Sequence, residues 1–185
     1  MKENRDIALA YILKWEDMSL NLSPNEPGGA SKGGVSVDYL TDYYRAIGLA
    51  RKAEIADVTV LTEADVRKVY GVMLLDALRF DELPSGVDYA LADVEVNSGS
   101  TGGVWVLQLA LGMWPLTGIL DAATMAAVQT EDPKSLVKAI RAAWISKKHE
   151  SPNWGPNPPI TKNGFGHGWS NRNIDARALA LGMCK

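Results

Sequence analysis

Acidic and hydroxyl residues gather near the N-terminus, in and beside a segment rich in glycine. Glu16 follows an apolar run that ends in Trp15, Glu26 comes ten residues later, and Ser31 lies five residues further on. Two carboxyl groups that flank a sugar, one of them a proton donor, are the groups that cleave most glycosidic bonds. These residue types could therefore carry out glycoside hydrolysis, and the glycines would let the backbone approach a sugar closely.

Glu16 is the candidate proton donor. It falls at the expected C-terminal end of a helix, where the negative end of the helix dipole and the apolar Trp15 both favour a neutral carboxylic acid. A neutral acid can protonate the oxygen of a breaking glycosidic bond. The alternative for the same residues is an ordinary solvated helix terminus followed by a long turn.

Other chemistries lack their residues. The chain has no HExxH motif, no phosphate-binding GxxxxGK[ST] loop and no Ser-His-Asp signature. Its two histidines, His149 and His167, and its one cysteine, Cys184, exclude a multi-histidine or multi-cysteine metal site. We expect neither a metal nor a cofactor.

Length and composition predict a soluble protein. The 185 residues, 46% of them hydrophobic, suit one domain or two small ones. The most apolar run, Val104–Leu120, is interrupted by Gln108, Gly112 and Pro115 and is shorter than the roughly 20 residues of a membrane span. The N-terminus shows no secretion signal, which favours synthesis in the cytoplasm.

The net charge of −3 conceals an asymmetry. Residues 1–133 carry ten basic and twenty acidic groups, whereas residues 134–185 carry nine basic and two acidic groups. A basic C-terminal part suits an anionic partner, although it could equally be the solvated face of a helix. Because no nucleic-acid motif is present and the aromatic residues do not alternate with the basic ones, we do not expect nucleic acid as a partner.

Helical periodicity and capping residues predict a mainly α fold. The expected helices are Asn4–Asp17, Asp38–Ala53, one that begins at Thr62, Pro84–Asn97, one that contains Val104–Leu111 and is closed by Gly112, a short one capped by Asp121, Asp132–His149 and Asn171–Leu181. Val58–Leu61 is the best candidate for a short strand. Ser151–Ser170, rich in Pro, Gly and Asn, is expected to be an irregular loop.

Several separated motifs resemble one enzyme family. Glu26–Ser36, which reads Glu-Pro-Gly-Gly-Ala-Ser-Lys-Gly-Gly-Val-Ser, resembles the catalytic loop of glycoside hydrolase family 108, the phage and prophage N-acetylmuramidases. Motifs similar to later parts of that family and of its C-terminal predicted peptidoglycan domain follow in the same order: Leu61–Asp65 with Tyr70, Asp81–Pro84, Ala92–Gly99, Leu107–Gln108 through Thr117–Thr124, and Gly168–Arg172.

The resemblance implies a lysozyme-like helical fold. It predicts a catalytic domain over residues 1–90 and a helical peptidoglycan-binding domain over 91–185, packed as one compact unit. The implied reaction is cleavage of the β-1,4 bond between N-acetylmuramic acid and N-acetylglucosamine. Glu16 takes the family's glutamate position as general acid. Glu26 and Ser31 replace an aspartate and a threonine that position water and stabilise the developing positive charge.

Four residues are candidates for sugar binding, because amides bond to N-acetyl groups and aromatic faces stack on pyranose rings. They are Asn97, Gln108, Trp154 and Trp169. We assign Trp105 and Trp144, which lie at helical spacing, to the core. Asp93 and Asn97 lie four residues apart and could instead form a cap network.

Asp17 and Met18 stand where the family has two glycines, and the lost backbone freedom could weaken an enzyme. Two alternatives to a muramidase are therefore a catalytically silent wall-binding or virion structural module and an adaptor whose basic C-terminal part binds an acidic partner. For the muramidase we expect a bacteriolytic monomer without a membrane span that acts on peptidoglycan glycan strands. It would leave the host cytoplasm through a holin or belong to a virion.

Overall fold

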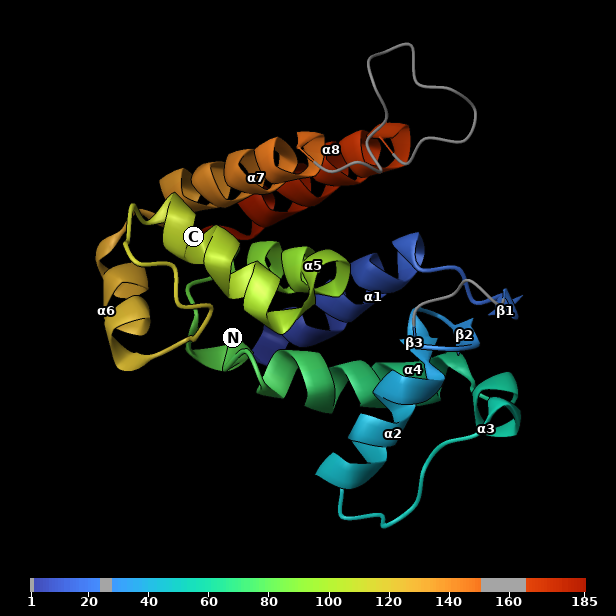
Figure 1. Ribbon diagram of the computed structural model, residues 1–185. Helices are drawn as coiled ribbons and strands as arrows, with labels where there is room; N and C mark the ends of the chain where they lie inside the picture. Colours follow the sequence, from blue (N-terminus) through green and yellow to red (C-terminus); the bar gives the residue numbers. More distant parts are fainter. Residues whose placement is uncertain (1, 24–27, 151–165) are drawn as a thin grey trace. The chain divides into compact units, whose positions relative to one another are not determined.

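The chain folds into two compact units that consist mainly of α-helices (Figure 1). The computed structural model describes residues 2–23, 28–150 and 166–185, and the units are Lys2–Arg79 and Phe80–Lys185. The prediction of a mainly α fold is confirmed. The predicted boundary between residues 90 and 91 falls inside helix α5, so the assignment of one function to each side of it stays a prediction.

The unit Lys2–Arg79 combines short helices with a small sheet. Its buried side chains include Ile12, Val35, Leu40 and Val66. Its elements are η1 (Lys2–Asn4), α1 (Arg5–Trp15), β1 (Leu20–Asn21), β2 (Ser31–Lys32), β3 (Val35–Ser36), α2 (Val37–Ala46), α3 (Ile55–Thr59), α4 (Glu63–Tyr70) and the π-helix η2 (Gly71–Asp76).

The glycine-rich segment lies in the small sheet. Strands β1, β2 and β3 are antiparallel in that order, and Ser31 on β2 pairs with Asn21 on β1 and with Ser36 on β3. Gly33 and Gly34 form the turn between β2 and β3, both with positive φ, a conformation that glycine adopts without strain. Periodicity did not predict these strands, because two residues are too few to show an alternation.

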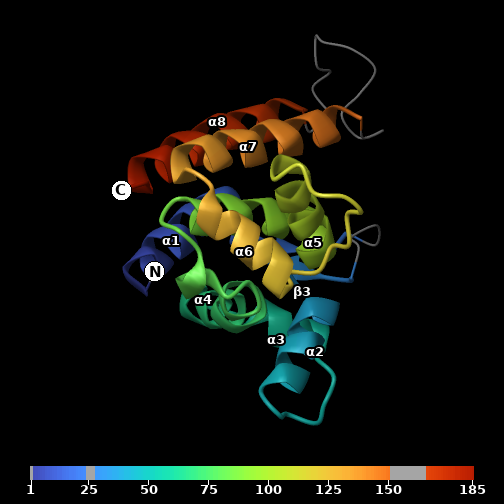
Figure 2. The ribbon, with the colours of Figure 1, turned by 90° about the vertical axis from the view of Figure 1, so that its left-hand side faces the viewer.

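The unit Phe80–Lys185 is built from longer helices. Its elements are η3 (Phe80–Glu82), α5 (Val87–Ala110), α6 (Ala122–Thr130), α7 (Pro133–His149) and α8 (Gly166–Met183). Helices α5, α7 and α8 pack on one another, and α7 and α8 lie side by side in both views (Figures 1 and 2). Leu107, Ile140, Trp144 and Ala176 are fully buried in this unit. None of the helices in the described residues is both long and apolar enough to cross a membrane.

Capping residues set several helix starts where the sequence predicted them. The Thr62 hydroxyl accepts a hydrogen bond from the Asp65 N–H, the Asp121 carboxylate accepts one from the Thr124 N–H, and the Asp132 carboxylate caps α7 just before Pro133. Each of these bonds satisfies a backbone donor in the first turn that has no partner inside its helix. The predicted starts at these three positions are confirmed.

Several predicted elements differ from the structure. Helix α2 ends at Ala46 rather than Ala53, and α8 begins at Gly166, inside the predicted loop. Val58–Leu61 is not a strand: α3 covers Ile55–Thr59, because Glu54 and Asp57 form a capping box that starts a helix there. The two helices predicted around residues 84–111 form one element, α5, which is broken at Gly99, where φ is 69° and ψ is 165°.

Candidate functional site

Glu16 ends helix α1 and leaves it in an extended conformation. Its N–H still donates to the Ile12 carbonyl at 3.2 Å, while its φ of −93° and ψ of 117° turn the chain away from the helix axis. The helix itself is held by Ala8, Leu9 and Leu13, which are buried. The Glu16 side chain is partly exposed, so it has a fixed backbone and can still reach a ligand.

The two residues that replace the family's glycines form a tight turn. The Asp17 carboxylate accepts hydrogen bonds from the N–H and the hydroxyl of Ser19, which lower the pKa of Asp17 and keep it ionised. The Asp17 carbonyl accepts a bond from the Gly33 N–H at 3.0 Å. Arg79 is the non-glycine residue with positive φ in the described part of the chain, so Asp17 and Met18 need no glycine conformation. Whether Asp17 and Met18 weaken the enzyme stays a prediction.

The β2–β3 turn approaches the carboxyl group of Glu16. A Cβ built on Gly34 would lie 2.9 Å from Oε2 of Glu16 and would overlap the hydroxyl of Tyr70. That hydroxyl, which is buried, donates to the Gly33 carbonyl at 3.1 Å and fixes the turn. The bare backbone of Gly34 therefore forms one side of the position that the Glu16 carboxyl occupies.

We expect Gly34→Ala to lower activity at least tenfold, because its Cβ must displace either Glu16 or Tyr70 at a positive φ of 76°. Gly48→Ala is the matched control: Gly48 has a positive φ of 79° and no heavy atom within 4 Å of its Cβ position. That change should cost about 1 kcal/mol of stability and leave the rate per folded molecule unchanged. Assays of peptidoglycan hydrolysis at equal folded concentration measure the difference. Equal rates for both variants would contradict the role of Gly34.

The other two predicted catalytic residues are Ser31 and Glu26. Ser31 lies on β2, only 8% exposed, in the same hairpin as Gly34. Its backbone is thus fixed by pairing on both sides. Glu26 lies outside the described residues, so its predicted role stays a prediction.

The side chain of Gln108 is buried and hydrogen-bonded within the protein. It is 1% exposed, its Nε2 donates to the Thr117 hydroxyl at 2.8 Å, and its Oε1 accepts from the Gly118 N–H at 3.0 Å. Nε2 also lies within 3.2 Å of the Ile119 carbonyl and the Thr124 hydroxyl. The amide therefore ties α5 to the loop that precedes α6, and its contact with substrate stays a prediction.

Asn97 likewise makes contacts inside its own unit. Its side chain donates to the Asp93 carbonyl at 2.9 Å, and its own carbonyl accepts from Nζ of Lys148 at 3.0 Å. Both contacts are local, and sugar binding by Asn97 stays a prediction. Burial and the neighbouring cations Lys147 and Arg172 lower the pKa of Lys148.

The tryptophans separate into core and surface. Trp144 is fully buried, as predicted, whereas Trp105 is 39% exposed, so its assignment to the core is wrong. Trp169 is half-buried, and the Lys148 ammonium lies 4.5 Å from the centre of its ring. Trp154 lies outside the described residues, and binding by Trp154 or Trp169 stays a prediction.

A buried ionic cluster joins α5, α7 and α8. The Asp93 carboxylate accepts from Nη1 of Arg141 at 2.7 Å and from Nε of Arg172 at 2.8 Å. All three side chains are at least 94% buried. Arg141 lies on the apolar face of its helix, near Ile140 and Trp144. A charged residue among apolar ones was the sequence signal for a buried ion pair. Part of the basic charge of residues 134–185 is therefore neutralised internally.

Glu95 is a second buried carboxyl group. It is 5% exposed, its Oε1 has no hydrogen-bond partner in the described part of the chain, and a Cβ on Gly103 would overlap its Cγ. Burial raises the pKa of Glu95 to about 8. The carboxyl group is thus neutral at pH 7 and packs against the second part of α5.

We expect Glu95→Gln to remove a pH dependence of stability. The unfolded state ionises Glu95 above about pH 4.5 and the folded state only above about pH 8, so wild-type stability falls as pH rises between these values. The loss at pH 7 is on the order of 3 kcal/mol. Urea unfolding at pH 5 and pH 8 tests this, and an equal slope in wild type and variant would contradict it.

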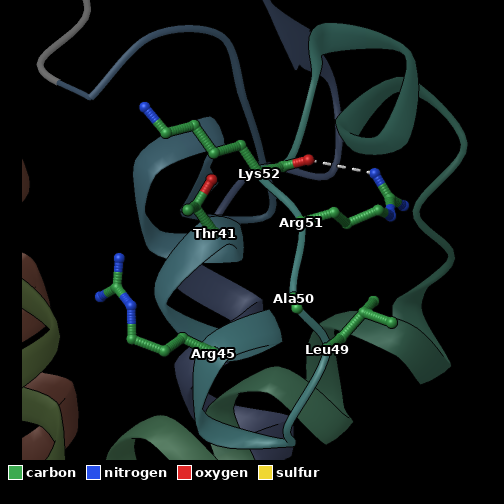
Figure 3. A pocket seen from close by; sticks show the side chains of 6 residues that line it. All are labelled: Thr41, Arg45, Leu49, Ala50, Arg51 and Lys52. Atoms are coloured by element: carbon green, nitrogen blue, oxygen red, sulfur yellow. Dashed lines mark hydrogen bonds between the residues drawn. The ribbon is translucent and has the colours of Figure 1, made fainter.

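One hollow in the unit Lys2–Arg79 lies between α2 and the segment before α3 (Figure 3). Its volume is about 310 Å³, and it is lined by Thr41, Arg45, Leu49, Ala50, Arg51 and Lys52. Arg45 pairs with Asp42 at 2.6 Å and Arg51 pairs with Asp57 at 2.7 Å. None of the lining residues is an acid, so this hollow lacks the proton donor that glycoside hydrolysis needs.

Comparison with known proteins gives the class of this chain. Residues 9–99 match the family model described as Glycosyl hydrolase 108, a span that begins in α1 and ends at the break of α5. This segment is a glycosyl hydrolase 108 domain, and it contains Glu16, the β2–β3 turn and Tyr70. The resemblance seen in the sequence is confirmed over this range.

One solved structure is similar to this chain over its full length. The structure of Brucella abortus SagA is 25% identical, with a TM-score of 0.82, and the match covers 100% of this chain and 98% of that one. None of the curated proteins matches significantly. The similarity therefore extends over both compact units, beyond the segment that the family model covers.

Proposed function

We propose that the protein is an N-acetylmuramidase that cleaves the β-1,4 bond between N-acetylmuramic acid and N-acetylglucosamine in peptidoglycan. The observation that carries this proposal is the position of Glu16 within the glycosyl hydrolase domain, partly exposed and beside the bare backbone of Gly34. A carboxyl group on a fixed backbone beside a glycine turn is suited to protonate a bridging oxygen at close range.

In this proposal Glu16, Glu26 and Ser31 have different roles in the reaction. The Glu16 proton moves to the leaving oxygen as the glycosidic bond breaks, and water supplies the hydroxyl group at the anomeric carbon. Glu26 directs that water or stabilises the positive charge on the sugar, and Ser31 helps to position it. The buried, paired backbone of Ser31 supports a positioning role.

The alternative of a catalytically silent module depended on Asp17 and Met18. Since both residues sit in an unstrained turn, the turn supplies no physical reason for inactivity. We retain the biological setting as part of the proposal: the enzyme reaches the wall from the host cytoplasm through a holin, or as part of a virion.

Digestion of purified peptidoglycan tests the proposal. The expected products are muropeptides with N-acetylmuramic acid at the reducing end, identified by borohydride reduction and mass spectrometry. Products that end in N-acetylglucosamine or in an anhydro sugar would indicate another bond or another reaction. The absence of any released product, with bound protein in the pellet, would favour the silent wall-binding module.

A further inference from the structure

A groove lies between the second part of α5 and helix α7 in the unit Phe80–Lys185. Its volume is about 210 Å³, and it takes side chains from α5, from the loop before α6 and from α7. Leu109 and Leu116 contribute apolar surface, whereas Ser146, Lys147 and Glu150 contribute polar groups. Leu109 is 52% exposed, so its side chain is accessible to a ligand in the groove.

Trp105 gives this groove an aromatic wall. A Cβ on Gly118 would lie 2.7 Å from Nε1 of Trp105, so the indole is held at its edge by the backbone of the loop. The Lys147 ammonium lies 4.9 Å from the ring centre, and Lys147 is itself exposed. The exposed Lys147 side chain therefore covers this face of the ring, and a ligand that stacks there displaces the ammonium.

The charges of the groove favour an uncharged ligand. Lys147 and Glu150 are its two ionisable lining residues, and their charges cancel. A phosphate polymer would meet the Glu150 carboxylate, and a cationic peptide would meet the Lys147 ammonium. A sugar ring has no charge, an apolar C–H face and several hydroxyl groups, which match an indole wall with a polar rim.

We propose that this groove binds an N-acetylhexosamine ring of a glycan strand. The C–H face of the sugar stacks on Trp105, the acetamide methyl group enters between Leu109 and Leu116, and the hydroxyl groups bond to the polar rim. The identity of the glycan rests on the proposed function. The groove would add a second contact with the glycan strand that does not involve Glu16.

Two tryptophan variants test the groove directly. In a Glu16→Gln background, which prevents hydrolysis, calorimetry measures binding of the N-acetylglucosamine tetrasaccharide, and pelleting measures binding to peptidoglycan sacculi. Trp105→Ala should weaken both about tenfold, because the stacked face is lost. Trp114→Ala is the matched control: this tryptophan is 84% exposed and does not line the groove, so binding should stay within twofold.

A third variant checks that a loss of binding is not caused by misfolding. Ser146 is exposed on α7, so Ser146→Tyr should fold normally and fill the groove, with a similar loss of binding. Wild-type affinity in Trp105→Ala or Ser146→Tyr would overturn the proposal. An equal loss in Trp114→Ala, or full competition by a free stem peptide without sugar, would overturn it as well.

Failure of this inference can be told from failure of the proposed function. If the protein with Glu16 intact releases muropeptides but Trp105→Ala binds as tightly as its parent, the groove is not a sugar site and the muramidase proposal stands. If no muropeptide is released but binding still depends on Trp105, the groove stands and the hydrolase proposal fails.

Discussion

Glu16→Gln is expected to reduce peptidoglycan hydrolysis at least a hundredfold, the usual contribution of a general acid, while the fold is retained. Glutamine has the same shape as glutamate, but its amide cannot give up a proton to the leaving oxygen. The bond that ends α1 is made by the backbone N–H of Glu16, so the substitution leaves it in place. Reducing ends released from sacculi measure the rate, and circular dichroism checks the fold.

Asp17→Asn provides the control for this experiment. The two carboxyl groups are adjacent in the chain, but that of Asp17 is held by Ser19, and its lowered pKa makes it a poor proton donor. Asparagine can still accept the bond from the Ser19 N–H. The control should therefore keep most of the activity. A fully active Glu16→Gln, or an inactive Asp17→Asn, would contradict the assignment of the acid.

Asp93→Ala is expected to destabilise the unit Phe80–Lys185 by about 3 to 5 kcal/mol, because it removes the buried carboxylate that pairs with two buried guanidinium groups. The Arg141 guanidinium also lies 4.7 Å from the centre of the Trp144 ring, so its displacement would disturb the core. Urea unfolding followed by tryptophan fluorescence measures the free energy of unfolding.

Asp76→Ala tests whether burial accounts for the stability that the Asp93 cluster contributes. Asp76 accepts a bond from Arg5 at 2.7 Å, the same distance as the Arg141–Asp93 bond, but its side chain is 55% exposed. A solvent-exposed pair contributes at most about 1 kcal/mol, so Asp76→Ala should have a small effect. Equal losses in the two variants would show that burial does not set the energy of the Asp93 cluster.

Local signals in the sequence were sufficient for three helix starts, and separated motifs were sufficient for the family of residues 9–99. The caps at Thr62, Asp121 and Asp132 act on backbone groups three residues away, so the sequence around each position contains the whole interaction. The order of motifs identified the glycosyl hydrolase domain before its geometry was known. The cap predictions depend on neighbours within one turn of helix, and the family prediction depends on the order of motifs along the chain.

Burial and side-chain pairing were decided by the tertiary structure. Trp105 and Trp144 have the same residue type at helical spacing, yet one forms a groove wall and the other is buried in the core. Gln108 matched a family motif, but the loop that folds over it uses its amide. Whether a side chain meets ligand or protein depends on elements far along the chain, which a local pattern does not contain.

The sequence by itself predicted most of the helices, the family of residues 9–99 and the candidate acid Glu16. Only the tertiary structure placed Gly34 against the Glu16 carboxyl group and joined Asp93 to Arg141 and Arg172. Those arginines lie 48 and 79 residues further along the chain than Asp93. Such contacts form because packing brings distant segments together and because buried charges require partners.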